Sequence, residues 1–387
     1  MPQVVPTLTL PRPQREQEPA PPHPPAPRRG RIAALDGLRL LAALMVVAYH
    51  YLAWRGSWPA PTEITFPTAF PFAVYGWLGV ELFFLISGFV ICMSCWGRSL
   101  GDFFVSRVSR LYPAYWLAVL TTSAVLLLVP GGWDPHPWPD ILINLTMLNE
   151  PLGVRSVDAV YWTLFAELRF YLLFAIVAWR GLTYRRVVVF CCVWAVAGLA
   201  FHKTGDEALR VMIMPTFCWY FIAGMAFYLM YRFRPTPLLT GIVLVCFGAS
   251  VSSARLVWRN TLDHFDRQIP FWPVALILVA CFALMALVAT GRLSWMNWRW
   301  LGYAGATTYP LYLLHEKIGW EIIGVLAPYV PGYLLVGLLT ACMLVAAYLV
   351  HRLVEKPVSG WLKHRLNRAV AESARQREDA SQRTPTH

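Results

Sequence analysis

Charged residues are scarce in this 387-residue chain, at 14% of the sequence against roughly 25% in ordinary soluble domains. Lysine is nearly absent, with four lysines against 29 arginines. The chain has no GxSxG motif and no P-loop, so it lacks the marks of the common soluble hydrolases and nucleotide triphosphatases. Period-two alternation of apolar and polar residues is also lacking, which favours membrane helices over a barrel.

The cysteines give no sign of a secreted disulfide framework. All eight lie in apolar segments, and the CxxC of Cys92 and Cys95 falls within one of them, where packing is the simpler interpretation. We expect no metal site. Residues 1–31 are rich in proline, contain five arginines and lack the apolar run of a signal peptide. They predict a disordered cytoplasmic tail.

The rest of the chain is 57% hydrophobic overall and contains ten apolar segments near the ~20 residues that a bilayer-crossing helix needs. An all-α, polytopic membrane bundle of about ten helices is therefore predicted, with a transmembrane domain over 32–357 and a polar cytoplasmic tail over 358–387. The segments cover residues 32–53, 72–95, 111–129, 157–179, 186–202, 211–231, 237–254, 271–290, 301–327 and 332–354.

The net charge of +12 could suggest nucleic acid, but its distribution indicates membrane topology. With the N-terminus inside, 23 of the 33 lysines and arginines fall in inner segments and seven in outer loops. This is the asymmetry of the positive-inside rule. Both termini are thus expected in the cytoplasm of a cell whose plasma membrane holds the protein, and no nucleic-acid partner is expected.

Ionisable residues inside the spans need a reason, because each costs roughly 2.5–3.5 kcal/mol on insertion scales. Asp36, Arg39 and His50 share one face of the first segment, since eleven residues make three turns plus about 20°. An interfacial ion pair and a satisfied polar histidine would also explain them. Glu81 is the acidic residue of the second segment, and we expect it to orient His50 as a general base. Helix packing alone is the alternative.

Arg107 and Arg110 share a face at the inner mouth of the third segment. Two guanidinium groups there suit phosphate, although ordinary positive-inside flanking would place them equally well. Glu167 and Arg169 lie in the fourth segment, and His315, Glu316 and Lys317 lie in the ninth. Both groups could line a polar cavity or pair with each other to stabilise the bundle.

At these residues the chain resembles the acyltransferase-3 family of membrane acyltransferases. Arg39 and His50 match its Arg-x10-His signature, and GVELFFLISGF matches its second-helix motif through Glu81 and Ser87. Further matches, in the expected order, are FFVSRVSRLYP, WTLFAELRFYLLF with Trp162 and Glu167, YPLYLLH with Tyr312 and His315, and VEKP.

The resemblance implies acyl transfer, usually from acyl-CoA as a donor substrate, to a hydroxyl of a sugar or related acceptor, with no permanently bound cofactor. His50 and Glu81 would be catalytic, and Arg39, Arg107 and Arg110 would hold the donor. The substrate pocket would include Asp36, Ser87, Trp162, Glu167, Tyr312 and His315.

The acceptor is the least defined part of this prediction. We expect no extracytoplasmic SGNH-type domain, because the tail after residue 363 is short. That length and an arginine-, alanine- and proline-rich, actinobacterial-looking composition fit the branch that acylates macrolide antibiotics at the lactone 3-hydroxyl. Acetylation of a cell-surface sugar or polysaccharide is the alternative acceptor class. A proton-coupled exporter is the rival function, and a structural membrane scaffold is a third.

Overall fold

The computed structural model describes residues 32–129, 134–202 and 206–383, and all regular elements in these ranges are helical. The predicted tail over 1–31 lies outside the described residues. The longer helices are α1 (Ala33–Ala48), α4 (Gly79–Cys95), α5 (Leu100–Leu128), α7 (Trp162–Ala178), α8 (Tyr184–Ala200), α10 (Cys218–Phe233), α11 (Pro237–Leu262), α12 (Trp272–Ala289), α13 (Arg299–Leu314), α15 (Gly332–Val350) and α16 (Lys356–Arg383).

Shorter elements connect these helices. They are the α-helices α2 (Thr62–Thr65), α3 (Phe70–Ala73), α6 (Trp138–Asn144), α9 (Glu207–Ile213) and α14 (Glu316–Leu326), the 3-10 turns η2 (Gly76–Leu78) and η3 (Ala159–Tyr161), and the π turns η1 (Tyr49–Ala53) and η4 (His351–Glu355).

Eight helical segments among the described residues are long and apolar enough to cross a membrane. The two other predicted segments are also helical: α8 has 17 residues, and α13 is separated from α14 by a break at His315. Large apolar side chains such as Leu127, Ile176 and Val196 are more than 60% exposed along the helices. Lipid is the environment in which such surfaces are stable. The prediction of a polytopic membrane helix bundle is confirmed.

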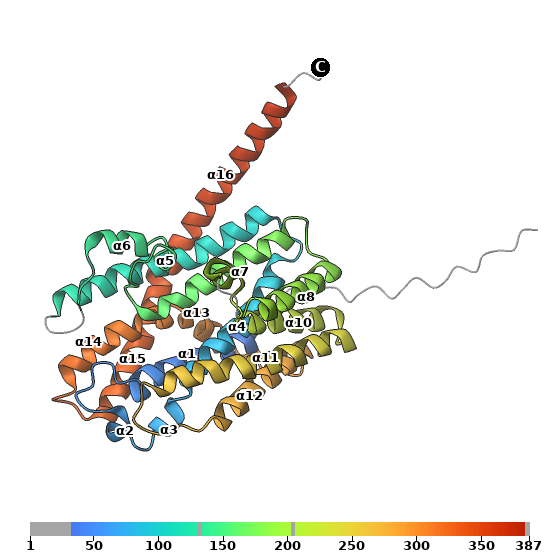
Figure 1. Cartoon of the computed structure of the whole chain (residues 1–387). Helices are drawn as coiled ribbons and strands as arrows, with labels where there is room; N and C mark the ends of the chain where they lie inside the picture. Colours follow the sequence, from blue (N-terminus) through green and yellow to red (C-terminus); the bar gives the residue numbers. More distant parts are fainter. Residues whose placement is uncertain (1–31, 130–133, 203–205, 384–387) are drawn as a thin grey trace, which may run out of the picture. The chain divides into compact units, whose positions relative to one another are not determined.

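Small residues bring the central helices close together. A Cβ added to Gly88 of α4 would overlap the carbonyl of Phe221 in α10, and one added to Gly224 of α10 would overlap the carbonyl of Leu85. Glycine at such crossings lets two membrane helices approach at backbone distance. α1 packs in turn against α4 and α13. Figure 1 shows α4 with α5 and α7 on one side and α11 and α12 on the other.

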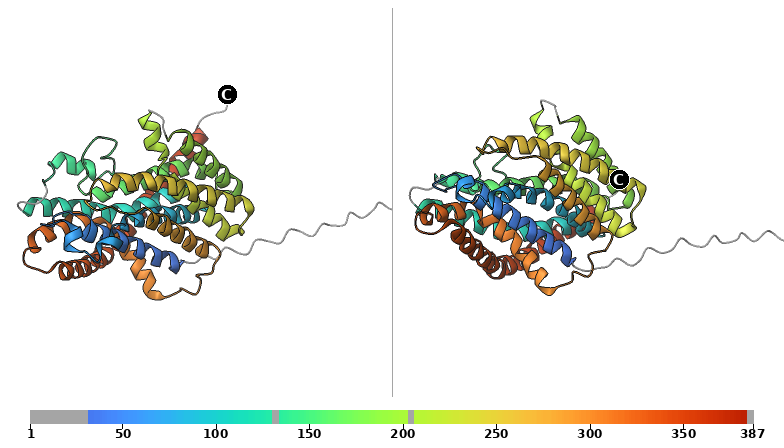
Figure 2. Two further views of the ribbon diagram at one scale, coloured as in Figure 1. Left: turned by 60° about the horizontal axis from the view of Figure 1, so that its bottom comes forward. Right: turned by 90° about the horizontal axis from the view of Figure 1, so that it is seen from below.

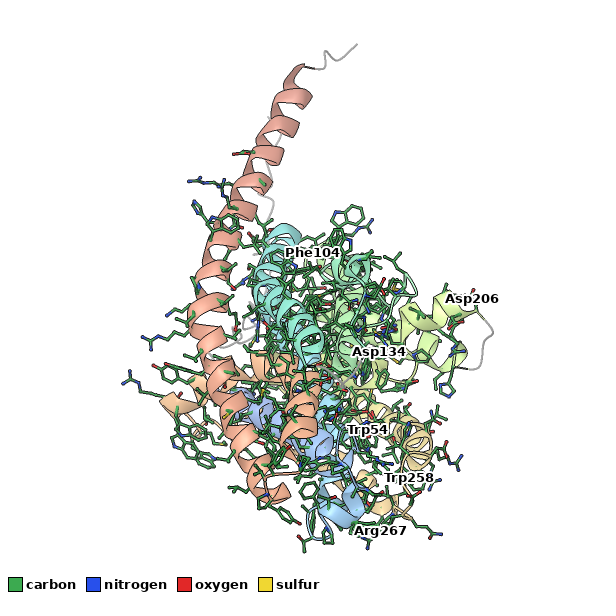
Figure 3. The ribbon with its side chains drawn as sticks, turned by 90° about the vertical axis from the view of Figure 1, so that its left-hand side faces the viewer. Trp54, Phe104, Asp134, Asp206, Trp258 and Arg267 are labelled. Atoms are coloured by element: carbon green, nitrogen blue, oxygen red, sulfur yellow. The ribbon has the colours of Figure 1, made fainter. Side chains whose placement is uncertain are left out.

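Helices from the beginning and the end of the described chain lie next to each other in the bundle. The first helices, in blue, lie beside the orange segment of α13 in both views of Figure 2, in agreement with the packing of α1 against α13. The segment predicted as a polar tail over 358–387 belongs, as far as Arg383, to α16. This helix packs against α5 and extends past Phe104 near the start of α5 (Figure 3).

Candidate active site

A pocket with a mainly apolar lining and four charged side chains lies among helices α1, α4, α5, α7 and α13. Its lining from α4 extends from Val80 to Ile91, and eleven residues correspond to about 16 Å of helix. The pocket therefore follows α4 lengthwise. Six of the eleven predicted site residues line it: Arg39, Ser87, Arg107, Arg110, Glu167 and Tyr312.

Positive charge dominates this pocket. Arg39 comes from α1, Arg107 and Arg110 come from α5, and Glu167 is the one carboxylate among the described lining residues. Arg107 is only 8% exposed, and its Nε has no hydrogen-bond partner in the described part of the chain. A buried guanidinium with an unused donor suits an anionic ligand, since leaving such a donor unpaired costs free energy. The three arginines and this unused donor give the pocket the charge that an anionic ligand would need.

Glu167 and Arg169 do not pair with each other. The hydroxyl of Ser87 donates a 2.6 Å hydrogen bond to Glu167 Oε1 inside the pocket. Arg169 instead donates to the carbonyl oxygen of Val211 at 2.7 Å, and its guanidinium lies 4.5 Å from the ring centroid of Phe165. The sequence left open whether these residues line a cavity or pair with each other. Glu167 lines the pocket, whereas Arg169 binds the backbone of α9.

A second cluster surrounds His50 and His315, which do not line the pocket. Nδ1 of His50 lies 2.9 Å from Nε2 of His315. His50 is carried by the π turn η1, and its carbonyl oxygen accepts a 3.0 Å hydrogen bond from Nε1 of Trp320. The hydroxyl of Tyr51 donates to the carbonyl of His315 at 2.7 Å. The two histidines are thus held as a pair through both side chains and backbone.

Glu81 is not brought to His50. No hydrogen bond joins these two described residues, and His315 contacts the imidazole instead. The reason is the offset between α1 and α4: a Cβ on Gly79 would overlap the carbonyl of Ala42, so the start of α4 lies level with Ala42. Along α1 and into η1, His50 lies eight residues beyond Ala42, or about 12 Å. Glu81, which is 2% exposed, is buried below the histidines.

Asp36 and Trp162 lie beside the pocket without lining it. Asp36 is 3% exposed and forms a 3.5 Å ion pair with Arg39, which places this carboxylate behind the pocket's α1 wall. The ring of Trp162 packs against Phe217, with centroids 5.0 Å apart. Both residues support the wall of the site.

Two buried carboxyl groups next to His315 include one that sequence reasoning did not single out. Asp158 is fully buried, and its Oδ2 accepts a hydrogen bond from the backbone N–H of Lys317 at 3.1 Å. Glu316 Oε2 accepts from the backbone N–H of Val160 at 3.0 Å. These bonds join the turn η3 to the start of α14. Asp158 lies in a connecting segment with no periodic pattern, so its sequence carried no signal.

Tyr312 links the pocket to the histidine pair. Its side chain lines the pocket, and its hydroxyl contacts Thr163 at 2.9 Å. Its carbonyl oxygen accepts from Nδ1 of His315 at 2.8 Å. Tyr312 therefore lies between this end of the pocket and the His50–His315 pair.

Several known proteins are similar to this chain in sequence. Acyltransferase MdmB of Streptomyces mycarofaciens is 32% identical over 187 residues, which cover 45% of each chain. The putative peptidoglycan O-acetyltransferase YrhL of Bacillus subtilis strain 168 is 23% identical over 335 residues, covering 74% of this chain and 48% of that protein. The exopolysaccharide production protein ExoZ of Rhizobium meliloti strain 1021 is 27% identical over 258 residues, covering 62% of this chain and 75% of that protein.

The matched regions thus span less than half of the length of the first two relatives. No solved structure matches the chain at a significant level. The acyltransferase domain family, in contrast, matches across residues 32–352, which include both the arginine-lined pocket and the histidine pair. The chain belongs to this family of acyltransferase domains.

Proposed function

We propose that this protein is a membrane O-acyltransferase that moves a short acyl group, such as acetyl or propionyl, from acyl-CoA to the lactone 3-hydroxyl of a macrolide antibiotic. The observation that carries acyl transfer is the arginine-lined pocket beside the His50–His315 pair, in a chain of the acyltransferase domain family. The macrolide acceptor is supported by the sequence resemblance and by the similarity to an acyltransferase of a Streptomyces.

The pocket would hold the donor. Arg107 and Arg110 would bind the phosphates of CoA at the inner end, and Arg39 would bind donor oxygens deeper in the bundle. His50, in η1, lies eleven residues beyond Arg39 of α1, or about 16 Å. The pocket follows α4 over a similar length, so an extended pantetheine arm would bring the thioester toward Tyr312 and the histidines.

At the outer end, an imidazole nitrogen of His50 would accept the proton of the acceptor hydroxyl as its oxygen attacks the thioester carbonyl. The new C–O bond forms, the C–S bond breaks, and the thiolate of CoA takes the proton from the His50 imidazolium. The products are the ester and free CoA. An acyl-His50 intermediate is the alternative route.

Our proposal also covers the class of acceptor and the membrane in which the protein lies. A hydroxyl of a cell-surface sugar or polysaccharide is the second candidate acceptor, and it is supported by the similarity to a putative peptidoglycan O-acetyltransferase and to an exopolysaccharide production protein. A bacterial plasma membrane is the compartment we propose, since the positive-inside pattern and the relatives from bacteria favour it.

Free CoA release by the purified protein in lipid nanodiscs tests this function. We expect acetyl-CoA or propionyl-CoA with a 3-hydroxyl macrolide to release CoA and give an ester detectable by mass spectrometry. A panel with sugar acceptors in place of the macrolide separates the two acceptor classes. His50→Ala should lose at least about 100-fold in turnover while still binding CoA. Wild-type turnover by that variant would exclude His50 from catalysis, and the absence of CoA release with every acceptor would favour an exporter.

A further inference from the structure

The surroundings of His315 determine which of its nitrogens carries a proton. Nδ1 of His315 lies 2.8 Å from the carbonyl oxygen of Tyr312 and 3.2 Å from that of Leu311. Carbonyl oxygens only accept hydrogen bonds, so Nδ1 must be protonated. His315 is fully buried within the helix bundle, where the uncharged imidazole is favoured by the cost of burying an ion. In that neutral form Nε2 has a lone pair and acts as an acceptor.

The proton on His315 then determines the tautomer of His50. Nε2 of His315 lies 2.9 Å from Nδ1 of His50, and an accepting Nε2 requires a donating N–H at Nδ1 of His50. The remaining nitrogen of His50, Nε2, is therefore left with a free lone pair. This is the form of the ring that can accept a proton or attack a carbonyl.

We propose that His315 is a positioning residue that holds His50 in the Nδ1-protonated tautomer and so directs Nε2 toward the reacting groups. This inference rests on the proposed acyl transfer for its functional meaning, whereas the tautomer itself is a property of the protein alone. It assigns to His315 the role that the sequence suggested for Glu81.

The backbone on both sides of the pair is built to hold this contact. A π turn contains one residue more per turn than the α-helix allows, and η1 at Tyr49–Ala53 therefore turns His50 away from the direction that α1 alone would give it. On the other side, His315 occupies the break between α13 and α14. The bonds from Trp320 to the His50 carbonyl and from Tyr51 to the His315 carbonyl fix both segments.

An imidazole also suits this position better than a carboxylate would. A carboxylate at residue 315 would add a third buried carboxyl group to a region that already holds those of Asp158 and Glu316, and burying a further charge costs free energy. A neutral histidine anchored to two backbone carbonyls sets the tautomer without that charge. The proposal thus explains why His50 has an uncharged partner.

Nitrogen-15 NMR of histidine-labelled protein in lipid bilayers tests the tautomer directly. The His50→Gln variant identifies the His50 signals by their disappearance. We expect His50 in the wild-type protein to be protonated at Nδ1 and unprotonated at Nε2. Protonation at Nε2 would overturn the proposal whether or not the protein transfers acyl groups. An Nδ1-protonated His50 in a protein that releases no CoA would support the tautomer and overturn the proposed function.

Two substitutions of His315 test the positioning role. His315→Leu removes the acceptor, and we expect mixed His50 tautomers and a kcat lower by at least about tenfold, with the KM for acyl-CoA within about twofold. His315→Gln can place its side-chain oxygen where Nε2 lay and accept from His50, so it should restore the tautomer and most of kcat. An unchanged His50 tautomer and kcat in His315→Leu would overturn the proposal.

A matched control separates these effects from general damage. His351→Gln changes a histidine on the other π turn, η4, where its Nδ1 contacts Glu355 at 2.9 Å and neither residue lines the pocket. It should leave the His50 tautomer and kcat as in the wild type. If His315→Leu does not fold, the wild-type spectrum and the His315→Gln variant still decide the question, because both retain a polar acceptor at residue 315.

Discussion

The hydroxyl of Ser87 donates to Glu167 across 2.6 Å, which joins α4 to α7 inside a pocket that otherwise carries three arginines. This contact holds the one carboxylate of the described lining, on α7, against the side chain of Ser87 on α4. A negative charge on Glu167 would oppose the binding of an anionic donor in the same cavity.

Removing that charge should tighten the binding of CoA. In Glu167→Gln the side-chain oxygen still accepts from Ser87, so the pocket keeps its shape while gaining one unit of net positive charge. We expect the Kd for CoA, measured by calorimetry in detergent, to fall about three- to tenfold at low salt and less at high salt. A weaker affinity for CoA would indicate that Glu167 positions the arginines rather than opposing the ligand.

The close crossing of α4 and α10 should tolerate no side chain at Gly88. In Gly88→Ala the new methyl group overlaps the carbonyl of Phe221, and overpacking of this kind typically costs about 1–3 kcal/mol. The apparent Tm of the purified protein should therefore fall. Gly241→Ala is the matched control, because a Cβ at Gly241 of α11 meets open space. An equal Tm for both variants would contradict the close approach of α4 and α10 at Gly88.

Both side-chain oxygens of Asp158 should be needed as hydrogen-bond acceptors for the fold to be stable. It accepts from the backbone N–H groups of Val160 and Lys317, so the amide in Asp158→Asn turns a donor toward one of them. An unsatisfied buried group costs about 1–3 kcal/mol, and we expect a lower Tm.

The control for this substitution is Asp206→Asn at the start of α9. Asp206 is exposed and accepts from the backbone of Leu209, and asparagine caps a helix about as well as aspartate. Its Tm should stay close to that of the wild type. An equal fall in Tm in the two variants would mean that the buried position of Asp158 adds nothing to the stability effect of the substitution.

The sequence predicted those parts of the site that depend on direction around a helix. Helical spacing placed Arg39 on an inward face, and the family resemblance assigned Ser87, Arg107 and Glu167 to the site; all four line one pocket. Helical periodicity fixes the face on which a residue lies but not the axial offset between two helices. The pairing of Glu81 with His50 depended on that offset, which close packing at Gly79 sets, and it does not occur.

The His50–His315 contact depends on local irregularities of the helices that could not be predicted from the sequence. The π turn at Tyr49–Ala53 and the break at His315 lie within apolar runs that predict uninterrupted helices. Each deviation is stabilised by long-range contacts, such as the bond from Trp320 to His50 across 270 positions of sequence. Such contacts become visible only in the folded chain.

Arg107 provides the clearest test of donor binding, because its buried Nε has no partner in the described residues. In Arg107→Ala the pocket loses one of three cations, and we expect the KM for acyl-CoA to rise about 10- to 100-fold with a smaller change in kcat. Arg107→Lys restores the charge without the guanidinium fork, so it should recover only part of the affinity.

The matched control for Arg107 is Arg255→Ala. Arg255 lies on α11 with its guanidinium 4.8 Å from the ring centroid of Phe271, and it does not line the pocket. Both substitutions remove one arginine that lies near an aromatic ring, which for Arg107 is that of Phe103. They therefore change the net charge alike, but Arg107 is buried at the pocket whereas Arg255 is exposed. If the KM for acyl-CoA rose equally in both variants, the overall charge of the protein rather than this pocket would attract the donor.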